Sequence, residues 1–143
     1  LTNPEMKRFF MTKDDAINLI ISAATIAKGG ETFVLKMPLI RLKDLFDSMK
    51  EVLASKYGYK PSQIKTKIIG IRPGEKLIEY LLTKFEMEHV LETKDFFIIP
   101  SLNISRKQIS YPNIQKSKND KLYFENMSTL SKQEISSILK KLY

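Results

Sequence analysis

The stretch IGIRPGEKL, residues 69–77, is the part of the sequence that says most about the fold. Its first residues continue an apolar, β-branched run that predicts a strand over residues 66–71. Pro73 and Gly74 then predict a tight turn, because proline fixes φ and glycine tolerates a positive φ. The residues that follow predict a helix over 75–82. The stretch is therefore typical of a strand–turn–helix unit in an α/β fold.

Helix and strand patterns alternate along residues 1–100. Apolar residues recur at helical spacing in three segments, and two short apolar runs bounded by turn residues predict strands. Thr12, with Asp15 three residues later, is the predicted N-cap of the first helix. The order favours a small α/β fold with few strands, flanking helices and some parallel pairing. The predicted helices span residues 13–28, 42–56 and 85–92, and the predicted strands span residues 31–36 and 95–99.

The composition changes after these segments. Residues 101–126 are rich in Ser, Asn, Lys and Gln without a sustained period, which predicts a long irregular arm. A capping box formed by Ser131 and Glu134, followed by an apolar stripe, predicts a terminal helix over about 132–142. We therefore expect two parts, an α/β domain in residues 1–100 and a basic arm ending in that helix in residues 101–143.

The composition excludes several classes of protein. The 143 residues are 43% hydrophobic and 28% charged, which is a globular mixture long enough to bury a core. No apolar run approaches the ~20 residues that a spanning helix needs. The absence of cysteine excludes disulfides, thiolate metal sites and a cysteine nucleophile. The first residues do not read as a signal peptide, so a cytoplasmic location is expected. Because the chain does not begin with Met, we expect it to be a piece of a longer protein.

The net charge of +8 is uneven along the chain. Residues 1–100 hold 16 Lys and Arg against 13 Asp and Glu, whereas residues 101–143 hold 8 against 3. Such an excess suits nucleic acid, an anionic membrane surface or a phosphorylated ligand, and the charge alone does not choose among them.

Arg72 and Glu75 are the first candidate binding residues. A predicted helix start leaves backbone N–H groups unpaired and therefore favours an anion, and the Arg72 guanidinium suits phosphate oxygens. The two oxygens of the Glu75 carboxylate both accept hydrogen bonds, so they could hold two vicinal hydroxyls, such as those of a ribose. Arg8, framed by Met6 and Phe9, is a second cation that a cleft could hold. The commoner alternative for each is an exposed turn or a solvated surface charge, and the residues alone leave both interpretations open.

Three motifs in this order resemble one enzyme family. They are Pro4-x-Met6-x-Arg8-Phe9-x-Met11-Thr12, the strand Phe33-Val34-Leu35-Lys36-Met37, and Gly70-x-Arg72-Pro73-Gly74-Glu75-Lys76-Leu77-x-Glu79. The family is the nucleotide-sugar epimerases and 4,6-dehydratases of polysaccharide biosynthesis, which are extended short-chain dehydrogenase/reductases. The resemblance spans about residues 2–100. Lys7 stands where the family usually has Thr, and Tyr80 stands where it usually has Glu.

The resemblance implies the C-terminal, substrate-binding part of such an enzyme. By matching position, Arg8 and Arg72 would hold the diphosphate of a UDP-sugar such as UDP-N-acetylglucosamine, and Glu75 the ribose hydroxyls. NAD(P) would be bound by an N-terminal Rossmann domain that is absent from these 143 residues. The resemblance also implies a homo-oligomer, with neither nucleic acid nor membrane as a partner.

The family's catalytic motifs are not found in this sequence. The five glycines, at 29, 30, 58, 70 and 74, do not form a dinucleotide fingerprint. One Tyr-x-x-x-Lys pair occurs at Tyr80 and Lys84, but it follows the nucleotide-gripping motif instead of a cofactor strand. His89 has no evident partner, and the acidic residues are spaced as a solvated helix face. We therefore expect binding without catalytic, cofactor-binding or metal-ligating residues in this chain.

The sequence thus predicts a UDP-gripping fragment of a UDP-sugar dehydratase or epimerase. The alternative is a stand-alone basic module that binds nucleic acid or another polyanion. UDP binding that depends on Arg72 would favour the first hypothesis. Binding of generic oligonucleotides that weakens steeply with salt would favour the second.

Overall fold

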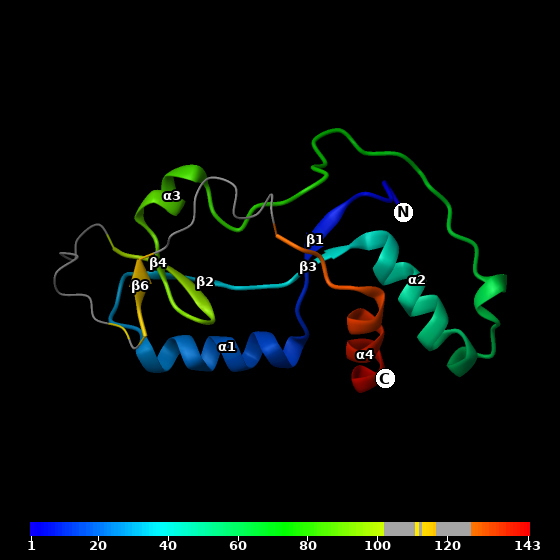
Figure 1. The fold of residues 1–143 in the computed structure, drawn as a ribbon, viewed down its shortest axis with the longest axis horizontal. Coiled ribbons are helices and arrows are strands. Elements are labelled where there is room, and N and C mark those ends of the chain that lie inside the picture. The colour runs from blue at the N-terminus through cyan, green and yellow to red at the C-terminus, as the bar shows by residue number, and fades with distance from the viewer. Residues whose placement is uncertain (102–110, 112, 117–126) are drawn as a thin grey trace. The chain divides into compact units, whose positions relative to one another are not determined.

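The computed structural model describes residues 1–101, 111, 113–116 and 127–143. They form a small mixed α/β structure with few strands and flanking helices, which confirms the predicted fold class (Figure 1). The chain divides into two compact units, and it passes from one to the other four times. Unit 1 consists of Leu1–Phe10, Pro38–Glu79 and Ser128–Tyr143, and unit 2 consists of Met11–Met37 and Tyr80–Met127. The predicted domain boundary after residue 100 stays a prediction.

Unit 1 is built on a two-stranded antiparallel sheet and two helices. β1 pairs with β3, which places Arg8 opposite Ile40. α2 begins at the residue after β3, and α4 packs against α2. Two short 3₁₀ turns follow α2. The elements are β1 (Lys7–Phe9), β3 (Leu39–Arg41), α2 (Leu42–Leu53), η1 (Ser55–Tyr57), η2 (Pro61–Gln63) and α4 (Lys132–Leu142).

The core of unit 1 joins residues that are distant in the sequence. Ile40, Ile135 and Leu139 are buried together, and apolar residues of α2, including Leu45 and Met49, pack against them. The apolar stripe of α4 therefore covers the apolar face of α2, as the helical spacing in both segments requires.

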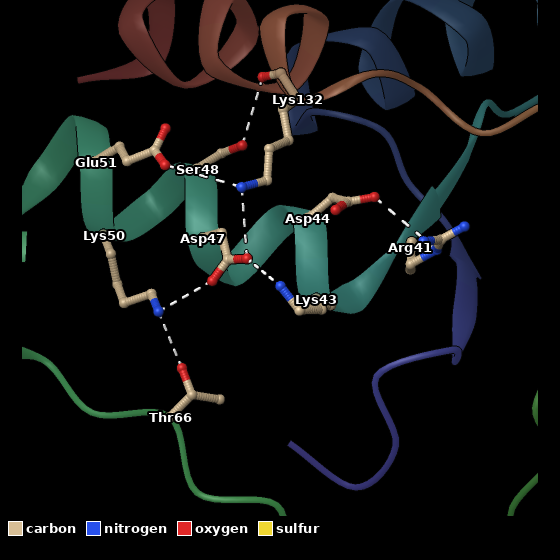
Figure 2. Close-up of polar contacts among 9 residues, drawn as sticks. All are labelled: Arg41, Lys43, Asp44, Asp47, Ser48, Lys50, Glu51, Thr66 and Lys132. Atoms are coloured by element: carbon tan, nitrogen blue, oxygen red, sulfur yellow. Dashed lines mark hydrogen bonds and ion pairs between the residues drawn. The ribbon is translucent and has the colours of Figure 1, made fainter.

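Asp47 is the centre of an ion-pair network between α2 and α4 (Figure 2). Its Oδ2 lies 2.6 Å from Lys43 Nζ and 3.5 Å from Lys132 Nζ, and its Oδ1 lies 3.0 Å from Lys50 Nζ. The hydrogen bonds from Lys43 and Lys50 hold the pKa of Asp47 well below its usual range. Next to it, the buried Ser48 hydroxyl donates to the Lys132 carbonyl at 3.4 Å. The network therefore fastens the first turn of α4 to α2.

Replacing Asp47 with asparagine is expected to lower the free energy of unfolding by about 1 kcal/mol at pH 7, because an ion-pair network near the surface contributes about that much. The folded-state pKa of Asp47 is lowered, so its contribution is complete above the unfolded pKa of about 4 and is lost as the pH falls through the folded value. Urea titrations of both proteins across this pH range should therefore show a difference that shrinks in acid. Glu51→Gln, which removes only a 3.8 Å contact with Lys132, should have a smaller effect. An equal loss in the two variants would contradict the central place of Asp47.

Unit 2 is a four-stranded antiparallel sheet with α1 packed against it. The strand order is β2-β5-β4-β6, and every pair is antiparallel. Leu19, Ala23 and Ile26 of α1 pack on the core of the sheet. The elements are α1 (Lys13–Ile26), β2 (Thr32–Leu35), α3 (Lys84–His89), β4 (Leu91–Glu92), β5 (Phe96–Ile99) and β6 (Gln115–Lys116).

Aromatic residues fill the core of unit 2. The Phe33 ring meets the rings of Phe96 and Tyr111 edge to face, with centroids 5.5 and 6.1 Å away. Tyr111 is buried, and burial together with a hydrogen bond to Glu31 raises the pKa of its hydroxyl to about 12. This hydroxyl therefore stays neutral throughout the physiological range.

The locally determined elements are where the sequence predicts them. Thr12 caps α1, since its Oγ1 accepts from Asp15 N at 3.1 Å and Asp15 Oδ2 accepts from Thr12 N at 3.2 Å. Ser131 and Glu134 form the predicted capping box of α4, whose bounds equal the predicted helix. The predicted helices over 13–28 and 42–56 and the strands over 31–36 and 95–99 are confirmed, each slightly shorter. Most of the predicted arm, residues 101–126, lies outside the described residues.

Two predicted elements around the IGIRPGEKL stretch are wrong. Residues 66–71 form no strand, since their backbone bonds within the described chain reach only Leu1, through Ile69 N–Leu1 O at 2.9 Å and Leu1 N–Lys67 O at 3.0 Å. Residues 75–82 form no helix, because Leu77 O accepts from Lys7 N at 2.8 Å and Ile78 forms a parallel bridge with Lys7. Pairing with β1 therefore overrides the local helix propensity of residues 75–82.

Two smaller expectations also need correction. The predicted helix over 85–92 divides into the short α3 and the strand β4, since Leu91 and Glu92 pair with β5. Parallel pairing occurs among the described residues only as isolated bridges, Lys7 with Ile78 and Leu39 with Thr129.

Candidate functional site

The turn from Arg72 to Glu75 is closed by two hydrogen bonds. Glu75 N donates to Arg72 O, and Arg72 N donates to Glu75 Oε2, each at 3.0 Å. Gly74 has a φ of 80°, which a residue with a side chain rarely adopts, so glycine suits this turn. The turn uses only the backbone of Arg72, and its side chain is exposed. The guanidinium therefore projects from a turn that does not depend on it.

A second contact on Glu75 comes from the beginning of the chain. Thr2 Oγ1 lies 3.3 Å from both Glu75 Oε1 and Met6 Sδ. A carboxylate is a much better acceptor than a thioether sulfur, so the Thr2 proton points to Glu75. Sequence reasoning missed Thr2, and no spacing could have revealed a contact across 73 positions. Both oxygens of Glu75 are thus held, and each keeps a lone pair for another donor.

Arg8 lies beside the segment that leaves this turn. It is the central residue of β1 and is half-buried, and its Nη1 donates to Lys7 O at 2.7 Å and to Leu77 O at 3.3 Å. Leu77 follows Glu75 by two positions, so Arg8 contacts the segment that leaves the turn between Arg72 and Glu75. Among the described residues, the Arg8 guanidinium contacts the Leu77 backbone, and no contact connects it with the guanidinium of Arg72.

The predicted contribution of a helix N-terminus is not realised. Since residues 75–82 are not helical, no helix dipole acts at this turn, and the attraction for an anion rests on the side chains of Arg8 and Arg72. Guanidinium groups remain charged at every physiological pH and donate without exchanging protons, so they bind and orient anions. The chemistry of the group is therefore anion and hydroxyl recognition.

A hollow of about 400 Å³ lies elsewhere in unit 1. It is lined by α2 and by the loop after it, including Met49, Leu53 and Tyr57, and its lining includes none of the three predicted site residues. The hollow and the turn are therefore separate features of this unit.

The structure also places Tyr80, Lys84 and His89, the other residues considered in the sequence. Tyr80 precedes the N-cap of α3, whereas Lys84 is its first residue, so the pair does not share a helix face. The His89 ring stacks on Phe85 at 4.8 Å, and its Nδ1 lies 3.0 Å from Phe85 O. Within the described ranges, His, Asp and Glu form no group of three that could hold a metal ion. Across the same residues, no helix is long and apolar enough to cross a membrane.

A family model described as polysaccharide biosynthesis protein matches residues 1–101. An uncharacterized membrane protein of Methanocaldococcus jannaschii, MJ1061, is 42% identical over 99% of this chain and 40% of its own length. The inverting UDP-N-acetylglucosamine 4,6-dehydratase of Campylobacter jejuni is 29% identical over 75% of this chain and 29% of its own.

A solved structure is also similar to this chain. The X-ray structure of Pen from Bacillus thuringiensis matches with a TM-score of 0.75 and 38% identity, over 99% of this chain and 40% of Pen. The 143 residues thus span about two fifths of the length of Pen and of the archaeal relative. Because the family model covers more than half of the sequence, this chain belongs to the polysaccharide biosynthesis protein family.

Proposed function

We propose that this chain is the part of a UDP-sugar dehydratase or epimerase that grips the UDP moiety. The observation that carries the proposal is the turn from Arg72 to Glu75, called here the clasped turn. In it, Arg72 N and Thr2 Oγ1 donate to the Glu75 carboxylate, and the Arg72 side chain is exposed. A fixed carboxylate beside a free guanidinium suits a ligand that presents hydroxyls on one side and an anion on the other.

Arg8 and Arg72 are assigned to the diphosphate. Arg8 has used Nη1 on two backbone carbonyls, which anchors its head and leaves its other N–H groups for phosphate oxygens. Hydrogen bonds between charged partners contribute about 1.5–3 kcal/mol each, so one such bond from each guanidinium supplies about 3–6 kcal/mol toward binding of the diphosphate.

The cofactor NAD(P) is assigned to other residues of the full-length enzyme. Dinucleotide binding needs a glycine-rich turn that leads from a strand into a helix. In this chain the adjacent pair Gly29 and Gly30 leads from α1 into β2, which is the opposite order. The described residues therefore do not fit the cofactor, and their role is to bind and orient the nucleotide sugar.

Calorimetric titration of the 143-residue chain with UDP tests this function. Saturable binding that is lost with uridine, which lacks the diphosphate, is expected. The alternative function, a basic module for polyanions, predicts instead that UDP gives no heat and that a mixed-sequence oligonucleotide binds with a steep salt dependence. That second outcome would overturn the proposal.

Replacing Glu75 with glutamine is expected to weaken UDP binding about tenfold, the low end for loss of a charge-assisted hydrogen bond. Glutamine retains the shape of the side chain and an acceptor for Arg72 N, so the turn should persist. The matched control is UDP that lacks the 2′- and 3′-hydroxyls, titrated into both proteins by calorimetry. The variant should bind this analogue as well as the unmodified chain does. Equal losses for UDP and the analogue would show that Glu75 does not read the ribose.

A further inference from the structure

The loop that follows α2 is strongly basic. Residues 55–69, called here the basic loop, contain Lys56, Lys60, Lys65 and Lys67 and no acidic residue. The chain as a whole has 24 cationic against 16 acidic side chains, so this loop concentrates positive charge. Of its four lysines, Lys56 donates to Tyr143 O at 2.6 Å. Figure 1 shows it as a long extended connection interrupted only by the 3₁₀ turns, and every residue in it is exposed.

The same loop exposes large apolar and aromatic side chains. The exposed fractions are 62% for Tyr57, 57% for Tyr59, 60% for Ile68 and 55% for Ile69. A single exposed apolar residue is common in soluble proteins, whereas several in one loop mark a surface that contacts a partner.

The lysines and the exposed apolar residues together narrow the class of partner that the basic loop could bind. A second copy of this chain would place four lysines against four lysines, so like-charge repulsion opposes self-association through the basic loop. A nucleic acid would satisfy the lysines and could stack a base on Tyr57 or Tyr59, but it would leave the aliphatic side chains of Ile68 and Ile69 in water. An anionic lipid surface satisfies both properties, because lysines attract its headgroups while isoleucine and tyrosine enter the interfacial region.

The hollow of about 400 Å³ adds a second observation. Its lining includes Tyr57, Ile64 and Lys65 of the basic loop, apolar residues of α2 such as Met49, and Leu1. Lys65 and Lys67 share this lining with apolar side chains, so a group in the hollow would contact both cationic and apolar residues. We propose that the basic loop is a peripheral contact surface for an anionic phospholipid bilayer, which revises the sequence-based expectation that no membrane is a partner.

Sedimentation of the 143-residue chain with vesicles tests this proposal. Vesicles made of equal parts phosphatidylglycerol and phosphatidylcholine should retain the chain at low salt, and vesicles of phosphatidylcholine alone should retain much less. Each lysine near an anionic surface contributes about a fivefold gain in binding, so Lys65→Gln with Lys67→Gln should weaken it about 20-fold. Ile68→Ser with Ile69→Ser should also weaken it, and the binding that remains should be more sensitive to salt.

The matched control is the double variant Lys13→Gln with Lys94→Gln, which removes the same charge from exposed positions of unit 2. It should bind vesicles nearly as the unmodified chain does, and circular dichroism should show that all variants are folded. Equal losses in the two lysine pairs would overturn the proposal, because net charge would then explain the binding. Failure to bind the anionic vesicles would overturn it too, as would selective binding of an oligonucleotide that needs Lys65 and Lys67. The affinity of the same variants for UDP is expected to equal that of the unmodified chain. Failure of the membrane proposal can therefore be distinguished from failure of the proposed function.

Discussion

Replacing Arg72 with alanine is expected to weaken UDP binding roughly ten- to hundredfold, the loss of one or two hydrogen bonds between charged partners. The guanidinium is exposed and the turn is closed by the backbone of Arg72, so alanine removes the ligand contact and retains the bond to Glu75. Isothermal titration calorimetry with UDP measures the change directly. The difference between the unmodified chain and the variant should nearly vanish for uridine, because the contact is assigned to the diphosphate.

Two further variants identify what Arg72 contributes. Arg72→Lys keeps the charge and loses the planar fork, so its affinity for UDP should lie between those of the unmodified chain and the alanine variant. Lys76→Ala removes a neighbouring exposed cation that lies outside the clasped turn and should change the affinity little. A comparable loss in Lys76→Ala would mean that UDP responds to the general positive potential, which contradicts a specific diphosphate contact.

Replacing Ile135 with alanine is expected to lower the free energy of unfolding by about 2–5 kcal/mol, the range for removing a large aliphatic side chain from a core. The Ile135 side chain is 1% exposed and packs with Ile40 and Leu139. The family match ends at residue 101, so this prediction concerns a part of the core that the match does not include. Urea unfolding followed by circular dichroism provides the measurement.

The neighbouring Ile138 offers the control for this prediction. It lies on the same helix with the same chemistry but is only half-buried, so Ile138→Ala should cost clearly less than Ile135→Ala. Similar losses of unfolding free energy in the two variants would contradict this prediction. They would show that the substitutions act through helix propensity and not through packing in the core. The Asp47→Asn variant is an independent comparison, since it loosens α4 through charge and leaves the apolar contacts intact.

The features that depend on neighbouring residues could be predicted from the sequence. The hydroxyl of Thr12 and the carboxylate of Asp15 are three positions apart, and the capping box they form needs no other part of the chain. The same reasoning places the beginning of α4 at Ser131, and the helical stripes of α2 and α4 identify their buried faces.

The features that depend on a distant partner could not be predicted. Ile69 and Ile71 have the composition of a strand, but a strand also needs an edge to pair with. Among the described residues, the backbone of this segment bonds only with Leu1. Leu77 has good helix propensity, yet its carbonyl accepts from Lys7, 70 positions earlier. Among the candidate site residues, the contact between Arg72 and Glu75 is local, and Arg8 was named from its apolar neighbours Met6 and Phe9 and from the family resemblance. Thr2 carried no signal at all.

The order in which the segments of unit 1 leave the ribosome has a consequence for how this chain is made. Ile40 and α2 emerge well before the helix that covers them, which belongs to Ser128–Tyr143. During synthesis the apolar face of α2 therefore stays exposed while about ninety further residues are added. In this period it can bind chaperones or other nascent chains. A stop codon among the codons for residues 132–142 would thus release a product in which α4 does not cover the core of unit 1, although every residue matched by the family model would have been translated.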